Sequence, residues 1–321
     1  MPLRPFLAQR TWFRIALQWH GSVVPVVLPR AILCGTFAAF IMLIYQVGNP
    51  IALPITASVV LNIVLGLMLV FRTNTAYERF WEGRRLWGGL NNTVRNLARN
   101  IWVNIPEKNV GDRDEKKAAL YLVVAFAVAM KLYLRQESAN EELKLLLSSA
   151  QYARLKQMNH PPLEIALWLQ DYLQQQNQRG YLTVYQVSVM QQLVNGMVDL
   201  LGGCERILKT PIPLAYAIHL KQLLLMYCLM LPFQLVKDFG WWTVPIATLI
   251  SFGLLGIEEI GIEIENPFGH DANDLKLDAF CEGMKRNIDE MMTSDSVSAH
   301  AFLLQEDQHP MLSTNLSRLT E

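Results

Sequence analysis

Long uncharged stretches divide this chain of 321 residues into two kinds of sequence. Four segments contain no Asp, Glu, Lys or Arg, and they cover residues 31–47, 51–71, 222–236 and 240–257. A helix needs about 20 mostly apolar residues to cross the hydrocarbon core of a bilayer. The second segment reaches that length outright. The others reach it when they are extended past one or two charged side chains to 26–47, 214–236 and 240–262. The pattern therefore predicts four transmembrane helices.

The remaining sequence has a helical pattern and a charge density typical of soluble domains. Segments 141–157 and 163–176 place apolar residues at spacings of three and four. Thr183 is suited to cap a long helix that ends at Leu208. The apolar run 118–130 is short and has charged flanks, which predicts a buried helix rather than a fifth span. Because no segment alternates like a strand, we expect an all-α integral membrane protein.

The distribution of positive charge predicts the orientation in the membrane. Four basic and no acidic residues precede the first uncharged segment: Arg4, Arg10, Arg14 and Arg30. The two short connections hold only Lys237 and Asp238 as charged residues. Since basic residues concentrate on the cytoplasmic side, both termini are expected there. The predicted parts are an N-terminal segment at 1–25, spans within 26–71, a cytoplasmic helical region at 72–213, spans within 214–262, and a cytoplasmic C-terminal segment and tail at 263–321.

Composition and motifs exclude several functions. The chain has 28 basic and 28 acidic residues, which argues against a basic nucleic-acid binder and against an acidic disordered chain. Its four cysteines lack paired zinc-ligand spacing and are expected to be free thiols. The sequence has no Gly-rich phosphate loop, HExxH motif or GxSxG motif. We therefore predict no catalytic residue, and the histidines show no metal-ligand spacing.

Within the second predicted span, apolar residues recur every four positions at Ile63, Leu67 and Phe71. Each step of four turns an α-helix by only about 40° from a full circle, so these side chains share one stripe. A lone stripe of this kind fits lipid contact or helix packing. With several copies of the helix around an axis, the stripes would form hydrophobic rings, which can gate an ion pathway by dewetting.

Two other functional classes remain open at this point. The large cytoplasmic region fits a membrane-anchored sensor or scaffold that conducts no ions. An integral-membrane enzyme would need polar residues that converge near the membrane face. The candidates for such a cluster are Glu258, Glu259, Glu263 and Glu265. For these residues we expect instead packing against Arg79, Arg84 or Arg206.

Four blocks of sequence together resemble the bestrophin family in its prokaryotic branch. They lie in the family's order along the chain, at Trp19–Val23, Phe71–Gly88, Cys204–Tyr216 and Glu258–Leu275. The last block includes the run Glu265-Asn266-Pro267-Phe268-Gly269-His270-Asp271. The resemblance implies a homopentamer with four transmembrane helices per subunit, a large helical cytoplasmic region and one axial pore.

The resemblance also assigns residues to the pore. The family's hydrophobic neck consists of three residues at four-residue spacing, the last directly before an arginine, and it falls on Ile63, Leu67 and Phe71. The family has a second constriction about nineteen residues before the Cys-Glu-Arg block. Counting back from Cys204 places this cytoplasmic aperture at Tyr185, or at Val184 if the register shifts by one.

Animal bestrophins bind calcium with an acidic segment after Asn-Pro-Phe-Gly, and the matching positions here are Asp271, Asp274 and Asn266. Calcium prefers six to eight oxygen ligands, and this segment offers fewer acids than the animal one. We favour a turn in which Asp271 and Asn273 accept bonds from backbone amides. The expectation is that no cofactor is required.

The resemblance does not decide whether the permeant ion is a cation or an anion. Animal and plant members resemble chloride or anion channels, whereas the bacterial type resembles a sodium-permeable cation channel. The bacterial spelling of the motifs favours a monovalent cation such as sodium. The resemblance also implies that the protein lies in the bacterial inner membrane. Its expected partners are lipid and other copies of the chain, and no nucleic acid is expected.

Overall fold

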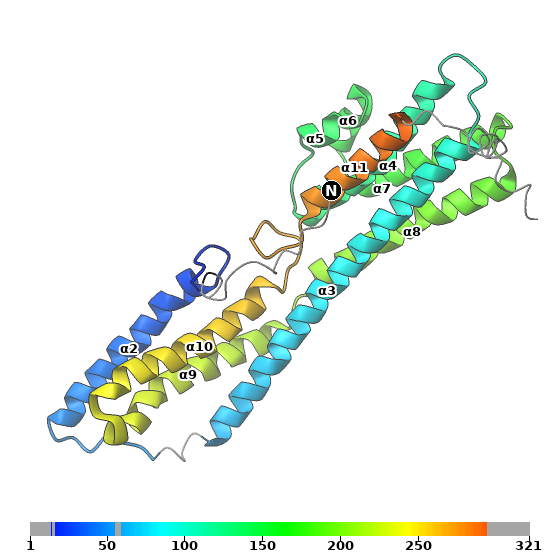
Figure 1. Ribbon diagram of the computed structural model, residues 1–321. Helices are drawn as coiled ribbons and strands as arrows, with labels where there is room; N and C mark the ends of the chain where they lie inside the picture. The colour runs from blue at the N-terminus through cyan, green and yellow to red at the C-terminus, as the bar shows by residue number, and fades with distance from the viewer. Residues whose placement is uncertain (1–13, 15–16, 55–58, 294–321) are drawn as a thin grey trace, which may run out of the picture. The chain divides into compact units, whose positions relative to one another are not determined.

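The computed structural model describes residue 14, residues 17–54 and residues 59–293, and within these ranges it is helical and contains no strand (Figure 1). The chain divides into two compact units. Unit 1 contains Met1–Gly88 and Leu200–Lys276, and unit 2 contains Gly89–Asp199 and Leu277–Glu321. The helices are α2 (Val24–Gln46), α3 (Val59–Asn104), α4 (Asp112–Leu134), α5 (Glu141–Lys144), α6 (Ser149–Leu155), α7 (Pro161–Gln178), α8 (Val184–Lys209), α9 (Leu214–Phe239), the 3₁₀ turn η2 (Gly240–Trp242), α10 (Thr243–Glu263) and α11 (Leu277–Thr293).

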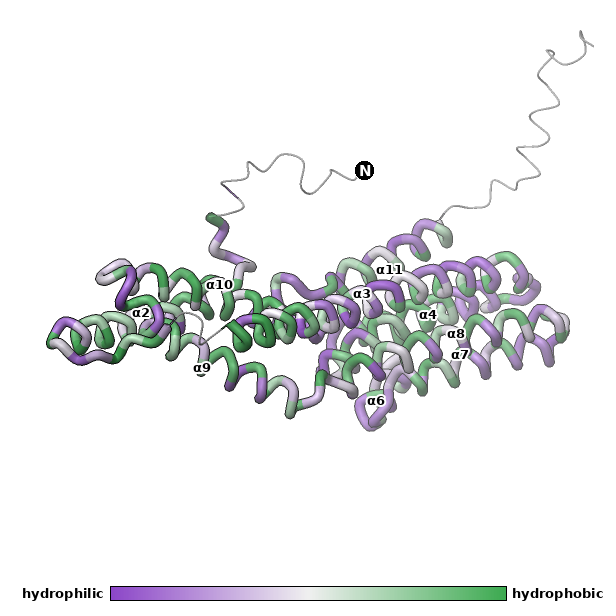
Figure 2. The backbone as a smooth tube through the Cα atoms, turned by 90° about the horizontal axis from the view of Figure 1, so that it is seen from below, coloured by the Kyte–Doolittle hydropathy of each residue, from purple (hydrophilic) through white to green (hydrophobic). Residues whose placement is uncertain are grey.

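Unit 1 is an apolar bundle in which α2, α9 and α10 pack against one another and the first part of α3 joins the core. Figure 2 shows that α2, α9 and α10 are hydrophobic along most of their length. The core includes Leu65 and Leu69 of α3 together with Leu220, Leu224 and Leu231 of α9. These helices account for the first, third and fourth predicted spans. By length and hydropathy, α2, α3 and the α9–α10 stretch Leu214–Glu263 could each cross a membrane.

The second predicted span differs from the prediction at both ends. Residues 51–54 are not helical, and Leu53 donates its backbone N–H to the carbonyl of Phe233 at 2.8 Å. Pro54 disfavours a helical conformation at the residue before it. Residues 55–58 lie outside the described part, and α3 begins at Val59. At its other end α3 continues without a break to Asn104, so one helix includes the predicted boundary at residue 72.

Unit 2 is built around α4, which is buried on nearly every side by α7 and α11. Its length and composition would also allow it to cross a membrane, but 78% of the relevant window is buried inside the protein. The prediction of a buried helix at 118–130 is therefore confirmed. Two charged residues of α4, Lys116 and Lys131, are buried with the apolar ones.

The other predicted helices of unit 2 are partly confirmed. The helical pattern at 141–157 corresponds to two helices, because two caps divide the segment into α5 and α6. The Asn140 side chain caps α5, and Ser148 and Gln151 form a capping box that starts α6. The prediction at 163–176 is confirmed by α7, and Thr183 caps α8 by accepting the Gln186 backbone N–H at 3.3 Å.

Candidate pore-lining face

The predicted neck residues lie on one exposed face of α3. The exposed fractions are 66% for Ile63, 53% for Leu67 and 56% for Phe71. The opposite face of the same turns packs into the unit 1 core, where Leu65 and Leu69 are 1% and 3% exposed. Three large apolar side chains are therefore brought together on a face that has no partner within the described part of one chain.

Arg72 fixes the rotation of α3 at the end of this stripe. Its side chain is only 5% exposed, and its NH2 group lies 2.7 Å from Oε2 of Glu265. A Cβ atom at Gly261 would lie 3.2 Å from Cγ of Arg72, so glycine lets the arginine side chain pass close to α10. Because consecutive residues differ by about 100° around a helix, an inward Arg72 holds Phe71 outward.

A second arginine ties α3 to the end of α8. Arg79 donates through Nε to the backbone carbonyl of Glu265 at 3.0 Å, and through its other nitrogens to the carbonyls of Ile207 and Thr210. Cationic side chains stabilise the carbonyl end of a helix. Burial, which disfavours the charged form, lowers the pKa of Arg79, and the nearby carboxylate of Glu265 opposes this.

The Phe71–Gly88 block therefore carries structural contacts within one chain. Arg206 of α8 lies 2.5 Å from Glu82 of α3, and Tyr216 donates to the carbonyl of Met68, one turn before the block, at 2.6 Å. The resemblance singled out this block, but the sequence pattern did not predict that Arg72 points inward. Two features of the sequence could have indicated the Arg72–Glu265 pair. Arg72 directly follows an uncharged run, and Glu265 lies just after the last predicted span.

The predicted cytoplasmic aperture lies at the first turn of α8. Val184 is 71% exposed and Tyr185 is 86% exposed, directly after the cap residue Thr183. Neither side chain packs into the core of unit 2, so both are free to face water, an axis or another copy of the chain.

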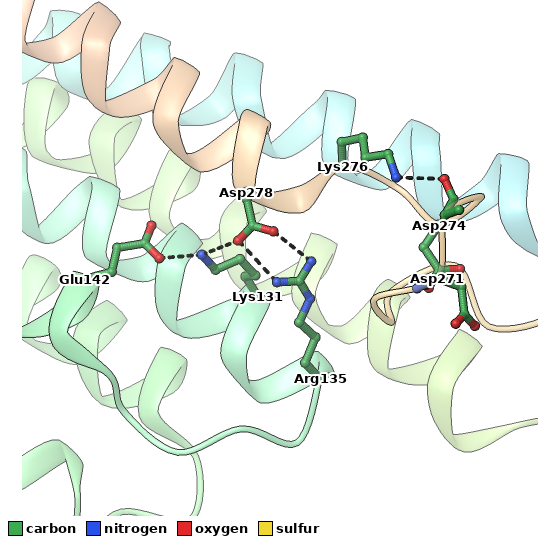
Figure 3. Close-up of polar contacts among 8 residues, drawn as sticks. Lys131, Arg135, Glu142, Asp271, Asp274, Lys276 and Asp278 are labelled. Carbon is green, nitrogen blue, oxygen red and sulfur yellow. Dashed lines mark hydrogen bonds and ion pairs between the residues drawn. The ribbon is translucent and has the colours of Figure 1, made fainter. Parts of the chain in front are cut away.

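The predicted calcium segment forms a turn, but with different bonds from those expected. The Asp274 carboxylate accepts the Asp271 backbone N–H at 2.8 Å and is 5% exposed, whereas Asp271 is exposed (Figure 3). Burial raises the pKa of Asp274, and the backbone hydrogen bond from Asp271 opposes this. The prediction that Asp271 and Asn273 accept the amide bonds is wrong. Asn273 donates instead, to the Gly21 carbonyl at 3.2 Å and to Glu263 at 2.8 Å.

The third predicted oxygen ligand, Asn266, also serves the turn, since its side-chain oxygen accepts the Phe268 N–H at 3.4 Å. Within the described residues no group of three or more His, Cys, Asp or Glu side chains is arranged to hold a metal ion. The four cysteines are free thiols, which confirms that prediction.

The four glutamates near the membrane face have separate partners. Glu265 pairs with Arg72, and Glu259 pairs with Arg30 at 2.7 Å. Lys221 lies 4.0 Å from Glu258, and Glu263 accepts from Asn273. The predicted packing against arginines is found for Arg79 at Glu265, whereas Arg206 pairs with Glu82. The group of Glu265 that accepts from Arg79 is its backbone carbonyl, and its carboxylate pairs with Arg72.

Comparison with known proteins decides the family. The family model described as bacterial/fungal bestrophin protein matches residues 5–290. The chain belongs to the bestrophin family. Among curated bestrophin-family relatives, a protein of Nostoc sp. is 56% identical over 92% of this chain and 96% of its own length, and one of Synechocystis sp. is 51% identical over 90% and 94%. Both are named voltage-dependent anion channel-forming proteins.

Solved structures agree with this bestrophin assignment. A bacterial bestrophin homologue from Klebsiella pneumoniae superimposes with a TM-score of 0.76 at 29% identity, and the match covers 82% of this chain and 97% of that one. A single-substitution variant of the same homologue gives a TM-score of 0.78 at 30% identity, over 85% and 99%. The all-helical prediction and the resemblance drawn from the four sequence blocks are confirmed.

Proposed function

We propose that this bestrophin is a homopentameric ion channel that passes monovalent ions through one axial pore. The observation that carries the proposal is the exposed stripe of Ile63, Leu67 and Phe71 on a helix whose other face is buried. Family membership and the channel-forming names of the relatives support it. Five copies of α3 around an axis would turn these stripes towards one another across the pore.

The stripe suits a gate. Residues at positions 63, 67 and 71 span about 12 Å along the helix. Five copies would form three stacked apolar rings, and such constrictions close to ions by dewetting. The buried Arg72–Glu265 pair supports a gate of fixed geometry, because it holds α3 against rotation next to the last ring.

The cytoplasmic aperture belongs to the same proposal. Tyr185 would form a ring of five side chains, with Val184 in that role if the register shifts by one. Support comes from the exposure of both residues at the capped start of α8. A tyrosine ring would present hydroxyl groups to the ion, in contrast to the purely apolar neck.

The sign of the permeant ion has support on both sides. Resemblance to bacterial bestrophins favours monovalent cations such as sodium, whereas the two curated relatives described above carry names that state anions. Hydrophobic rings do not select by charge, so the choice belongs to charged rings along the pore. Reversal potentials under bi-ionic gradients of sodium and chloride salts measure the preference directly.

We propose further that conduction needs no bound calcium or other cofactor. One Asp274 oxygen already accepts a backbone N–H within its own turn, which supports this. Currents that persist in a calcium chelator are expected, and currents that vanish with the chelator and return with calcium would contradict it. For topology we propose the bacterial inner membrane with both termini cytoplasmic, which reporter fusions at each end can test.

The subunit count in detergent tests the whole proposal. The expected result is a pentamer by native mass measurement, followed by ion flux when that fraction is placed in liposomes. A monomer would contradict the axial pore. A pentamer without flux under any gradient would favour the alternative, a non-conducting membrane-anchored sensor or scaffold.

A further inference from the structure

The exposed face of α3 continues past Phe71 and changes from apolar to charged. Each residue of an α-helix adds about 100° of rotation and about 1.5 Å of rise. Glu78 and Arg85 follow Phe71 by seven and fourteen residues, so both return to within about 40° of its direction, about 10 Å and about 20 Å farther along. Both side chains are exposed, whereas Ala76 and Trp87 on the inward face are fully buried.

These two charges differ from their neighbours in having no partner. Among the residues that the structure describes, neither Glu78 nor Arg85 makes a hydrogen bond or an ion pair. The neighbouring Arg79 and Glu82 are bound within unit 1, Arg79 to backbone carbonyls and Glu82 to Arg206. The helix therefore directs its structural charges inward and leaves one acid and one base unpaired in line with the neck.

We propose that Glu78 and Arg85 set the ion preference of the channel. The proposal rests on the proposed pentamer, in which they form an acidic ring next to the neck and a basic ring one heptad beyond it. Rings of charged side chains select ions by sign, and narrow passages with low-dielectric walls strengthen their field. The two rings act in opposite directions. Glu78 favours cations at the mouth of the neck, and Arg85 favours anions farther along.

The test uses full-length pentamers of Glu78→Gln and Arg85→Gln in planar bilayers, with bi-ionic reversal potentials as the readout. A unit charge about 10 Å from an ion changes the local ion concentration about twofold in water. The cation-to-anion permeability ratio is therefore expected to fall at least about twofold in Glu78→Gln and to rise in Arg85→Gln. Both shifts should shrink in about 1 M salt, where the screening length is about 3 Å.

The control is Arg84→Gln, which removes the same charge at nearly the same height but on a face turned by about 100°. Reversal potentials that stay at the wild-type value in both pore variants, or that move in the same direction, would overturn the inference. Loss of the pentamer in Glu78→Gln but not in Glu78→Asp would also overturn it, because the carboxylate would then bind a neighbouring subunit. A wild-type protein that is monomeric or passes no ions would instead contradict the proposed function.

Discussion

The ammonium nitrogen of Lys131 lies 2.9 Å from a carboxylate oxygen of Asp278, and this pair joins α4 to α11 inside unit 2 (Figure 3). Lys131 is only 2% exposed and also bonds Glu142 of α5. Arg135 donates to both oxygens of Asp278 at 3.2 and 3.0 Å. A buried lysine is tolerated only when its charge is paired. The network therefore fixes the positions of α5 and α11 relative to α4.

Acid should destabilise unit 2 through Asp278. Arg135, and then Lys131, lower the pKa of this carboxyl to about 2, although burial opposes the shift. An unfolded aspartate has a pKa of about 3.9. Because the folded pKa is the lower one, the stabilisation is complete above about pH 4 and is lost as the pH falls towards 2.

The measurement is the thermal unfolding midpoint of the full chain in detergent between about pH 2 and pH 5, a window set by the two pKa values. As the pH falls across this window, the unfolding midpoint should drop by more degrees in the wild type than in Asp278→Asn, which lacks the titrating group. Equal slopes for the two proteins would show that the pair contributes nothing to the acid response.

Substitution of Arg72 by Met should destabilise unit 1. Among the described residues, the change leaves the Glu265 carboxylate, which is 17% exposed, with the Ile212 backbone N–H at 2.9 Å as its hydrogen-bond donor. Removal of one member of a buried ion pair costs about 3–5 kcal/mol in the free energy of unfolding. Urea unfolding in detergent measures the loss.

The matched control for Arg72 is Arg206→Gln, which removes an Arg–Glu pair of the same unit that is 67% and 36% exposed. An exposed pair contributes about 1 kcal/mol or less. If the two substitutions lowered the free energy of unfolding equally, burial would not explain the contribution of the Arg72–Glu265 pair to stability.

The helix contact between α2 and α10 should tolerate no side chain at Gly35. A Cβ atom there would lie 2.2 Å from Oγ1 of Thr248, which belongs to a short, stiff side chain. Gly35→Ala should therefore lower the free energy of unfolding by about 1–3 kcal/mol. Thr248→Ala in the same protein should restore much of it, and Gly253→Ala, where nothing lies within 4 Å, serves as the control. Loss of equal size at both glycines would contradict a specific contact.

Sequence pattern predicted the features that depend on local spacing. The stripe of Ile63, Leu67 and Phe71, the cap at Thr183 and the buried run at 118–130 follow from helical geometry and hydropathy alone. The partners of buried charges could not be predicted in this way. Arg72 meets Glu265 across 193 positions of sequence, and no local rule selects that glutamate over three others nearby.

The same limit explains the turn after Asn266. Its composition predicted a turn with side chains bonded to backbone amides, but it led to the wrong aspartate, Asp271, as the acceptor. Asp274 is the acceptor because it is the buried one, and burial depends on the fold. Family membership supplied what pattern could not, namely the expectation of five copies around an axis.

Widening the proposed neck should increase conductance. Replacement of Ile63, Leu67 and Phe71 by Ala removes three exposed apolar side chains, so the loss of folding stability should be small. Wider and less apolar rings hold water more readily, and single-channel currents in planar bilayers should rise or lose their closed periods. The control is Leu249→Ala, which replaces another exposed apolar residue, in α10. Wild-type current size and ion preference in the triple variant would make the neck assignment wrong.

The aperture prediction distinguishes between two neighbouring residues. Tyr185 is 86% exposed, so Tyr185→Ala should change the free energy of unfolding by no more than about 0.5 kcal/mol. If five tyrosine rings narrow the exit, this variant should raise the unitary conductance, and Tyr185→Phe should keep the conductance while it removes the hydroxyl groups. Val184→Ala, at the adjacent position, should then leave the current unchanged. If Val184→Ala raised the conductance and Tyr185→Ala did not, Val184 rather than Tyr185 would form the aperture. Only one of the two can face the axis directly, because consecutive side chains on a helix point about 100° apart.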